Sequence, residues 1–245
     1  MDESALIILA VGAASAGFIA GLTGLGTALT ALAFWLHIMP PQTAVPLACA
    51  IAIVNHIVSL SFVRQGFMWR RVWPFLVGGA VGLPIGVLAL SALDSNTAKA
   101  GLGIFLILYC TYGLVVRQPP TVTGGGRLAD GTVGMGGGFL GGLCGIAGPL
   151  PTIWAGLRGW PKDQQRAVYQ PFNLFVLGTS AVGHLMLGRY QALPVESLIV
   201  FPIVAVCAVL GILTYRRLAD HHFRKVVLIM LMVGGIVQIV DWLGS

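Results

Sequence analysis

Long apolar runs occupy most of the chain, and short groups of charged residues separate them. Between one charged residue and the next, the runs cover residues 4–63, 72–93, 100–116, 131–157, 167–188, 197–215 and 226–240. Several of them reach the roughly 20 residues that cross about 30 Å of hydrocarbon as an α-helix. The pattern therefore predicts an all-α integral membrane protein with several spans.

Composition strengthens this reading. Apolar residues make up 57% of the 245 residues and charged residues only 9%, whereas about 25% of a soluble domain is charged. The net charge of +6 would suggest nucleic acid in a soluble protein, but here the basic residues lie between the apolar runs. We read them as signals of membrane orientation and expect membrane lipid, not nucleic acid, as the surrounding partner. The first run follows Asp2 and Glu3 and lacks a basic n-region, so we expect it to stay in the mature protein.

The chain repeats itself. The stretch GFIAGLTGLG at residues 17–26 aligns with GFLGGLCGIA at residues 138–147 after a shift of 121 residues, with five identities. The same shift pairs Pro40 with Pro161 and Ser59 with Ser180. We therefore predict one transmembrane domain of two related halves, residues 1–117 and 131–245. A connector over residues 118–130, whose proline and glycine content disfavours a helix, joins them.

Each half opens with an apolar stretch that glycines interrupt, residues 5–37 in the first half and 131–157 in the second. If each opening stretch crosses the membrane once, every half has four spans and the halves run parallel. If it dips in and returns, every half has three spans and the second half is inverted.

The basic residues decide between these topologies, because loop Lys and Arg concentrate on the cytoplasmic side. Single crossings divide the 14 basic residues almost evenly, whereas dips leave only Lys99 and Arg189 on one side. We therefore predict two inverted repeats, each a broken, re-entrant helical hairpin followed by three transmembrane helices. Both termini are then expected outside the cell.

The two interruptions are candidate binding sites for an anion. A helix that restarts inside a membrane points free N–H groups and the positive end of its dipole into a protein cavity, which favours an anion. Gly24, Gly26, Gly145 and Gly148 would let a ligand approach the backbone, and hydroxyl donors would come from the neighbouring threonines, Thr23 and Thr27. Glycine-rich stretches also serve ordinary close helix packing, but their occurrence at equivalent places in both halves favours a site.

Few polar residues lie inside the remaining spans. Asn55 and His56 fall in the span after the first interruption, and Gln170 and Asn173 in the corresponding span of the second half. Such groups are costly in lipid and face the interior. Amides fit an oxyanion, and His56 could carry a proton that is coupled to transport. The alternative role for Asn55 and Asn173 is hydrogen bonding between helices.

The stretches at residues 17–26 and 138–147 resemble the paired signatures of the sulfite exporter TauE/SafE family, and the likeness extends over both halves. The resemblance implies transport of sulfite, of sulfonates such as sulfoacetate, or of related small sulfur or carboxylate anions across a bacterial cytoplasmic membrane. Ala147 and Pro149 stand where the family has glycines, so we expect the second interruption to differ in shape from the first.

The sequence therefore favours a secondary transporter for a small anion in the bacterial inner membrane. It would work by alternating access, with coupling to protons left open. An anion channel and, less well supported, a membrane-embedded enzyme are the alternatives. The histidines and acidic residues show no metal-binding or catalytic spacing, so we expect no catalytic residue, no metal and no cofactor. Whether the chain forms a homodimer stays open.

Overall fold

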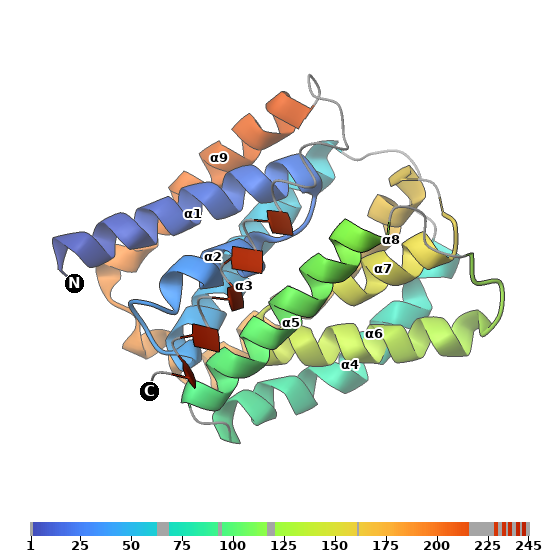
Figure 1. The fold of residues 1–245 in the computed structure, drawn as a ribbon, viewed down its shortest axis with the longest axis horizontal. Helices are drawn as coiled ribbons and strands as arrows, with labels where there is room; N and C mark the ends of the chain where they lie inside the picture. The colour runs from blue at the N-terminus through green and yellow to red at the C-terminus, as the bar shows by residue number, and fades with distance from the viewer. Residues whose placement is uncertain are drawn as a thin grey trace.

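The computed structural model describes residues 2–62, 69–92, 95–116, 121–160 and 162–215, together with scattered positions between 228 and 243. Every regular element in this part of the chain is helical (Figure 1). In chain order the elements are α1 (Glu3–Thr23), α2 (Thr27–Trp35), α3 (Pro41–Phe62), α4 (Trp69–Ala92), α5 (Ser95–Val115), α6 (Gly126–Cys144), α7 (Pro149–Leu157), α8 (Lys162–Met186), η1 (Arg189–Ala192), η2 (Val195–Ile199) and α9 (Val200–Tyr215).

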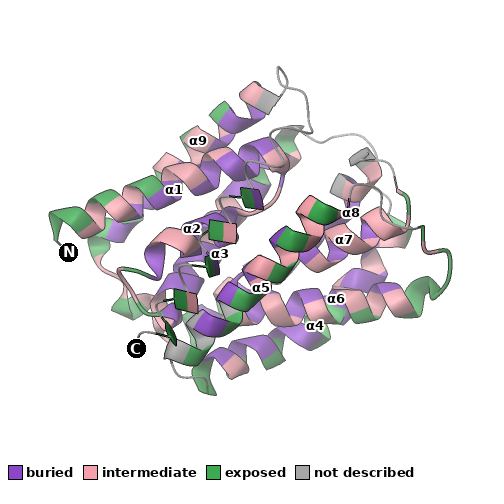
Figure 2. Ribbon diagram, in the orientation of Figure 1, coloured by how far each residue is buried: buried purple, intermediate pink, exposed green. Residues whose placement is uncertain are grey.

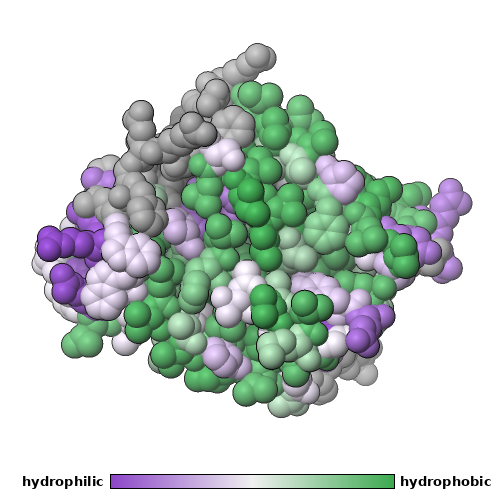
Figure 3. Space-filling model, turned by 180° about the vertical axis from the view of Figure 1, so that it is seen from behind, coloured by the Kyte–Doolittle hydropathy of each residue, from purple (hydrophilic) through white to green (hydrophobic). Residues whose placement is uncertain are grey.

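The surface of the helical bundle is that of a membrane protein. In the part of the chain that the structure describes, four segments are long and apolar enough to cross a bilayer: Glu3–Thr23, Pro41–Ser61, Trp69–Ala92 and Val195–Thr214. Their outward faces carry large apolar side chains, such as Leu88 at 63% exposure and Val206 at 60% (Figure 2). Seen from behind, hydrophobic residues cover the middle of the molecule and hydrophilic residues gather toward its two ends (Figure 3). The prediction of an all-α chain is confirmed for the described residues, and the four candidate spans are consistent with an integral membrane protein.

Both predicted interruptions are breaks between helices. Helix α1 ends at Thr23, and the chain passes through Gly24 (φ 74°) and Gly26 (φ 92°) before α2 begins at Thr27. Helix α6 ends at Cys144, and Gly145 (φ 70°) caps it before α7 begins at Pro149. Left-handed backbone of this kind suits glycine, which has no Cβ to clash with the following carbonyl.

Each short helix turns back along the helix before it. At the end of α2, the Trp35 indole donates a hydrogen bond to the Leu9 carbonyl of α1 at 3.1 Å. In α7, the Trp154 indole donates to the Asp130 carboxylate of α6 at 2.7 Å. Leu9 and Asp130 are related by the shift of 121 residues. Two helical hairpins of the same construction therefore open the two halves.

The opening helix of each half packs in parallel against the third long helix of the other half. Helix α1 lies beside α9, and α4 lies beside α6 (Figure 1). Glycines let the backbones touch, because a Cβ on Gly17 or Gly138 would overlap the main chain at Val204 or Gly79. We call these contacts the α1–α9 seam and the α4–α6 seam. Small residues at such spacing allow close helix packing in membranes.

The two seams repeat each other contact for contact. Gly21 faces Ala208 where Gly142 faces Leu83, and Gly211 faces Phe18 where Gly86 faces Phe139. A shift of 121 residues relates the opening helices, and a shift of 125 relates Gly86 to Gly211. These contacts follow the repeat in the sequence, so the duplication extends to how the helices pack.

Helices α3 and α8 cross the centre of the bundle in opposite directions. Near the start of α3, the Pro46 carbonyl accepts a hydrogen bond from Tyr190, which follows α8. Further along α3, Cys49 Sγ lies 3.7 Å from Ser180 Oγ, and Ala52 and His56 share a cavity with Leu177 and Asn173, earlier in α8. The central pair thus brings the polar residues of both halves together.

The structure corrects the predicted connector and covers the last predicted span only in part. Helix α6 begins at Gly126, so residues 126–130 of the predicted connector are helical. Asp130, within them, is buried and bonded to Arg158 at 3.0 Å. The prolines and glycines upstream of Gly126 led to a predicted connector that extends too far into the helix. Of the last predicted span, residues 226–240, the structure describes scattered positions. Six of the basic residues used for topology lie outside the described residues: Arg64, Arg117, Arg216, Arg217, Arg224 and Lys225.

Candidate anion-binding site

A cavity lies where the two helix breaks meet. Its walls come from the start of α2, the start of α7 and the middle of α3 and α8, and it encloses ≈ 280 Å³ of empty space including its mouth. The lining residues are Leu25, Gly26, Thr27, Ala28, Leu29, Ala52, His56, Gly145, Ile146, Ala147, Gly148, Pro149, Asn173 and Leu177. Backbone released from helical pairing thus faces a protein cavity, as a membrane interior requires.

The two halves contribute equivalent positions to this wall. Twelve of the lining residues form six pairs under the shift of 121: Leu25 with Ile146, Gly26 with Ala147, Thr27 with Gly148, Ala28 with Pro149, Ala52 with Asn173, and His56 with Leu177. No sequence pattern short of the repeat itself would select this set. The cavity therefore lies at the interface between the repeats, where secondary transporters place their substrate sites.

Backbone donors are unequal at the two helix starts. The first N–H groups of a helix have no partner within it, and in α2 they belong to Thr27, Ala28 and Leu29. In α7 the first three residues are Pro149, Leu150 and Pro151, and proline has no N–H. The first three residues of α2 therefore carry three N–H groups, whereas those of α7 carry only that of Leu150.

Three polar side chains face the cavity, and each comes from a different helix. Thr27 starts α2, His56 lies in α3 and Asn173 lies in α8, and all three are at most 5% exposed. The Asn173 Oδ1 atom has no hydrogen-bond partner among the described residues. This oxygen is an acceptor, so Asn173 can serve an anion only by donating through its Nδ2 group.

Six of the ten predicted site residues line this cavity: Gly26, Thr27, His56, Gly145, Gly148 and Asn173. The structure does not bring the other four to its wall. Thr23 turns its hydroxyl back to the Ile19 carbonyl at 2.9 Å, and Gly24 caps α1 by donating to the Ala20 carbonyl at 2.7 Å. Both complete the end of a helix.

Asn55 and Gln170 are buried behind the wall. Asn55 is 2% exposed and bonds to Thr27 at 3.1 Å, so it reaches the cavity only through that side chain. Gln170 is 1% exposed, and its Oε1 has no partner among the described residues. Helix α3 turns His56 toward the cavity, and Asn55 is not among the lining residues.

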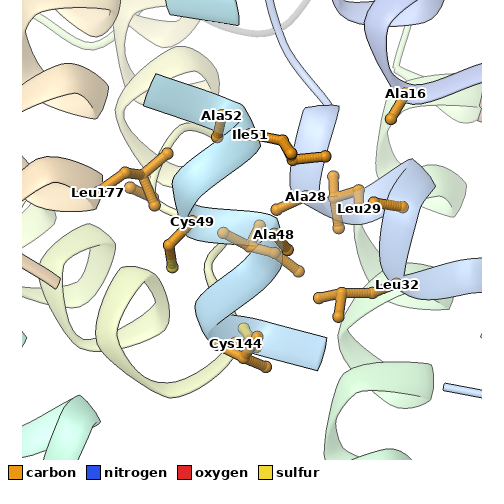
Figure 4. Close-up of a cluster of buried hydrophobic side chains, with 14 of the residues drawn as sticks. Ala16, Ala28, Leu29, Leu32, Ala48, Cys49, Ile51, Ala52, Cys144 and Leu177 are labelled. Carbon is orange, nitrogen blue, oxygen red and sulfur yellow. The ribbon is translucent and has the colours of Figure 1, made fainter. Parts of the chain in front are cut away.

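Sequence reasoning missed the apolar part of the wall. Ala52 lies one helical turn before His56, and Leu177 one turn after Asn173. Figure 4 shows Ala28 and Ala52 on neighbouring helices, with Leu177 approaching from the other side of α3. Helical spacing of four residues would have found both side chains, since residues at that spacing share a face.

Metal-binding groups are not part of this arrangement. Among the residues that the structure describes, no three His, Cys, Asp or Glu side chains gather closely enough to hold a metal ion. The chemistry on offer is hydrogen-bond donation from α2, Thr27 and Asn173, with His56 as a titratable group. It can hold an oxyanion without a salt bridge.

These features describe a helical protein with apolar candidate spans and a cavity at two helix breaks that three polar side chains face. A family model described as sulfite exporter TauE/SafE matches residues 8–237. The chain belongs to this family.

A curated relative is similar to this chain over most of its length. The relative is the probable sulfite/organosulfonate exporter TauE of Cupriavidus necator, which is 25% identical over 199 residues, covering 77% of this chain and 75% of the relative. No solved structure matches the chain significantly.

Proposed function

We propose that this protein is a secondary transporter that carries sulfite, an organosulfonate or a related small anion across the cytoplasmic membrane by alternating access. The observation that carries the proposal is the cavity between the two breaks, whose lining forms six pairs across the repeat. Membership of the TauE/SafE family and the name of the relative support the choice of anion.

The substrate is held without a basic side chain. No residue of the cavity wall is an Asp, Glu, Lys or Arg, and His56 is the wall residue that can gain a proton. Each helix start contributes about half a unit of positive charge, worth roughly 0.3–2 kcal/mol depending on burial. A few such contacts give weak binding of about micromolar to millimolar strength, which suits a carrier because it must also release its substrate.

Flux through proteoliposomes tests the transport mechanism. Uptake of labelled sulfite should saturate with concentration, and internal unlabelled sulfite should accelerate it by exchange. A channel would show neither saturation nor exchange. Imposing a pH gradient should change the rate if a proton moves with the anion, and a His56→Gln variant should remove that dependence. Flux equal to that of protein-free vesicles would contradict the proposal.

The two halves are inverted repeats in this proposal, with both termini outside. The opposed directions of α3 and α8, which occupy equivalent places in the halves, support inversion. The return of α2 along α1 and of α7 along α6 supports re-entrant hairpins.

Topology is tested by labelling single cysteines in a background without Cys49, Cys110, Cys144 and Cys207. Cysteines replacing Arg127 and Lys162 should react with an impermeant reagent from the cytoplasmic side, and one replacing Arg189 from the outside. Reaction of the first two from opposite sides would refute the second re-entrant hairpin.

A further inference from the structure

A chain of three polar side chains runs from α3 to the first residue of α2. The Ser59 hydroxyl donates to Asn55 Oδ1 at 3.3 Å, and Asn55 Nδ2 donates to Thr27 Oγ1 at 3.1 Å. Their exposed fractions are 4%, 2% and 3%. Of these three residues, only Thr27 belongs to the cavity wall. The row of hydrogen bonds therefore leads from the protein interior to the candidate site.

The direction of donation determines where the Thr27 hydrogen points. A hydroxyl carries one hydrogen and accepts through its lone pairs, and Asn55 Nδ2 occupies an accepting position of Thr27 Oγ1. Because Thr27 is the first residue of α2, no carbonyl one turn earlier in that helix can take its hydrogen. Within the described ranges, no other hydrogen bond of the Thr27 hydroxyl is found.

We propose that Asn55 and Ser59 are positioning residues that aim the Thr27 hydroxyl hydrogen into the cavity, where it donates to an oxygen of the bound anion. This inference rests on the proposed function, because it needs an anion in the cavity. In the structure the Ser59 hydroxyl donates to Asn55 Oδ1, which leaves Nδ2 to donate to Thr27. The reverse order would spend the Thr27 hydrogen on Asn55 and present only lone pairs to the anion.

The second half does not repeat this row of hydrogen-bonded side chains. Gly148 stands at the position equivalent to Thr27, and Val176 at the position equivalent to Asn55. Ser180, the equivalent of Ser59, lies 3.3 Å from His184 Nε2 and 3.7 Å from Cys49 Sγ instead. Loss of the Thr27 donor is therefore not compensated across the repeat.

Binding of sulfite to the full-length protein in detergent, measured by calorimetry under nitrogen, tests the donor itself. Thr27→Val should weaken binding roughly 10- to 100-fold, because it removes a hydrogen bond to a charged group. Thr27→Ser keeps the hydroxyl and should bind within about threefold of the natural protein. Ser61→Ala is the matched control for Ser59→Ala, because Ser61 lies on the same helix, is exposed and bonds only to the Ile57 carbonyl.

A double-mutant cycle separates positioning from direct contact. Asn55→Leu should weaken binding in the natural protein roughly 5- to 50-fold but by less than about twofold in the Thr27→Val background. Ser59→Ala should follow the same pattern with a smaller loss, and Ser61→Ala should change nothing. Melting temperatures of all variants show whether each remains folded.

The outcomes distinguish this inference from the function on which it rests. If Asn55→Leu costs the same factor with and without the Thr27 hydroxyl, Asn55 contacts the ligand itself and the positioning role is refuted while the anion site stands. If Thr27→Val binds sulfite as tightly as the natural protein, the donor is refuted. If the natural protein binds neither sulfite nor sulfoacetate, the proposed function fails as well.

Discussion

The two helix breaks share a backbone plan and differ in chemistry. Each joins a long helix to a nine-residue helix that returns along it, and each sends equivalent positions to one cavity. At those positions, however, the residues differ: Thr27 corresponds to Gly148, and His56 corresponds to Leu177. The two breaks therefore share the backbone shape of the cavity, whereas single residues that differ between the repeats give the cavity its polarity.

The far ends of the hairpins diverge in the same way. In the first half, Trp35 is held by a backbone carbonyl at Leu9. In the second half, the Asp130 carboxylate accepts from the Trp154 indole and from Arg158, whose guanidinium also lies 4.9 Å from the Trp154 ring centroid. An ion pair stands where the first half has a main-chain acceptor, so charge helps to hold the second short helix, whereas a neutral hydrogen bond holds the first.

The largest loss of stability is expected at the α1–α9 seam and the α4–α6 seam. Because the two seams are built alike, the loss should be similar at both. A Cβ on Gly82 would overlap the Met135 carbonyl of the α4–α6 seam, and one on Gly17 would lie 2.6 Å from the Val204 carbonyl of the α1–α9 seam. Valine at either position should destabilise the protein by more than about 3 kcal/mol, because tightly packed backbones cannot move apart cheaply. Thermal unfolding in detergent measures this.

Gly101→Val is the control, because a Cβ on Gly101 in α5 meets nothing within 4 Å. If valine were tolerated at one seam and not at the other, the two seams would not be structural equivalents.

A smaller effect should separate the two breaks, because their glycines serve different purposes. Gly26 has a φ of 92° and room for a Cβ, whose nearest neighbour would be 3.8 Å away. Alanine there should cost about 1–2 kcal/mol of stability through backbone strain and weaken anion binding less than alanine at Gly148.

At Gly148 the φ is −70°, which any residue adopts, but a Cβ would lie 2.7 Å from Asn173 Nδ2 and from Leu25 Cδ2. Gly148→Ala should therefore weaken sulfite binding roughly tenfold or more with little change in melting temperature. If Gly148→Ala lowered stability but not affinity, and Gly26→Ala lowered affinity but not stability, the anion would not bind in this cavity.

Much of this plan could be predicted from the sequence. Charge-free runs gave the spans, and the repeated glycine motif located both breaks to within a residue, because glycine tolerates the left-handed backbone at Gly24, Gly26 and Gly145. The boundary of α6 was missed because Gly124 and Gly125 precede a helix that then begins with another glycine.

The wall of the site was predicted only in part, because composition does not fix which way a helix is rotated. Asn55 and His56 are adjacent in sequence, yet only His56 faces the cavity. The pairing of Ala52 with Asn173 became visible only once α3 and α8 were placed side by side. The shift of 121 residues relates Ala52 to Asn173, but alanine has no polar group that would mark it as a candidate site residue.

The smallest and sharpest effect comes from exchanging polarity between the halves. Asn173→Ala should weaken sulfite binding by roughly threefold to tenfold, because it removes an amide from the wall. Adding Ala52→Asn places an amide at the equivalent position of the first half, and we expect it to restore part of the affinity. Ala52→Leu in the same background adds bulk without an amide and serves as the control. Equal affinity in the two double variants would show that the pseudo-symmetric pairing has no functional meaning.

The central claim is that the cavity between the breaks holds a small anion, and a titration of ligands against the purified protein tests it most directly. Sulfite, sulfoacetate, acetate and the cation choline are compared by calorimetry on the natural protein and on Gly148→Ala. The account predicts micromolar to millimolar binding of one or more of the anions, no heat from choline, and loss of the anion signal in the variant. Binding of choline without a response to any anion, or anion binding that Gly148→Ala leaves intact, would contradict it.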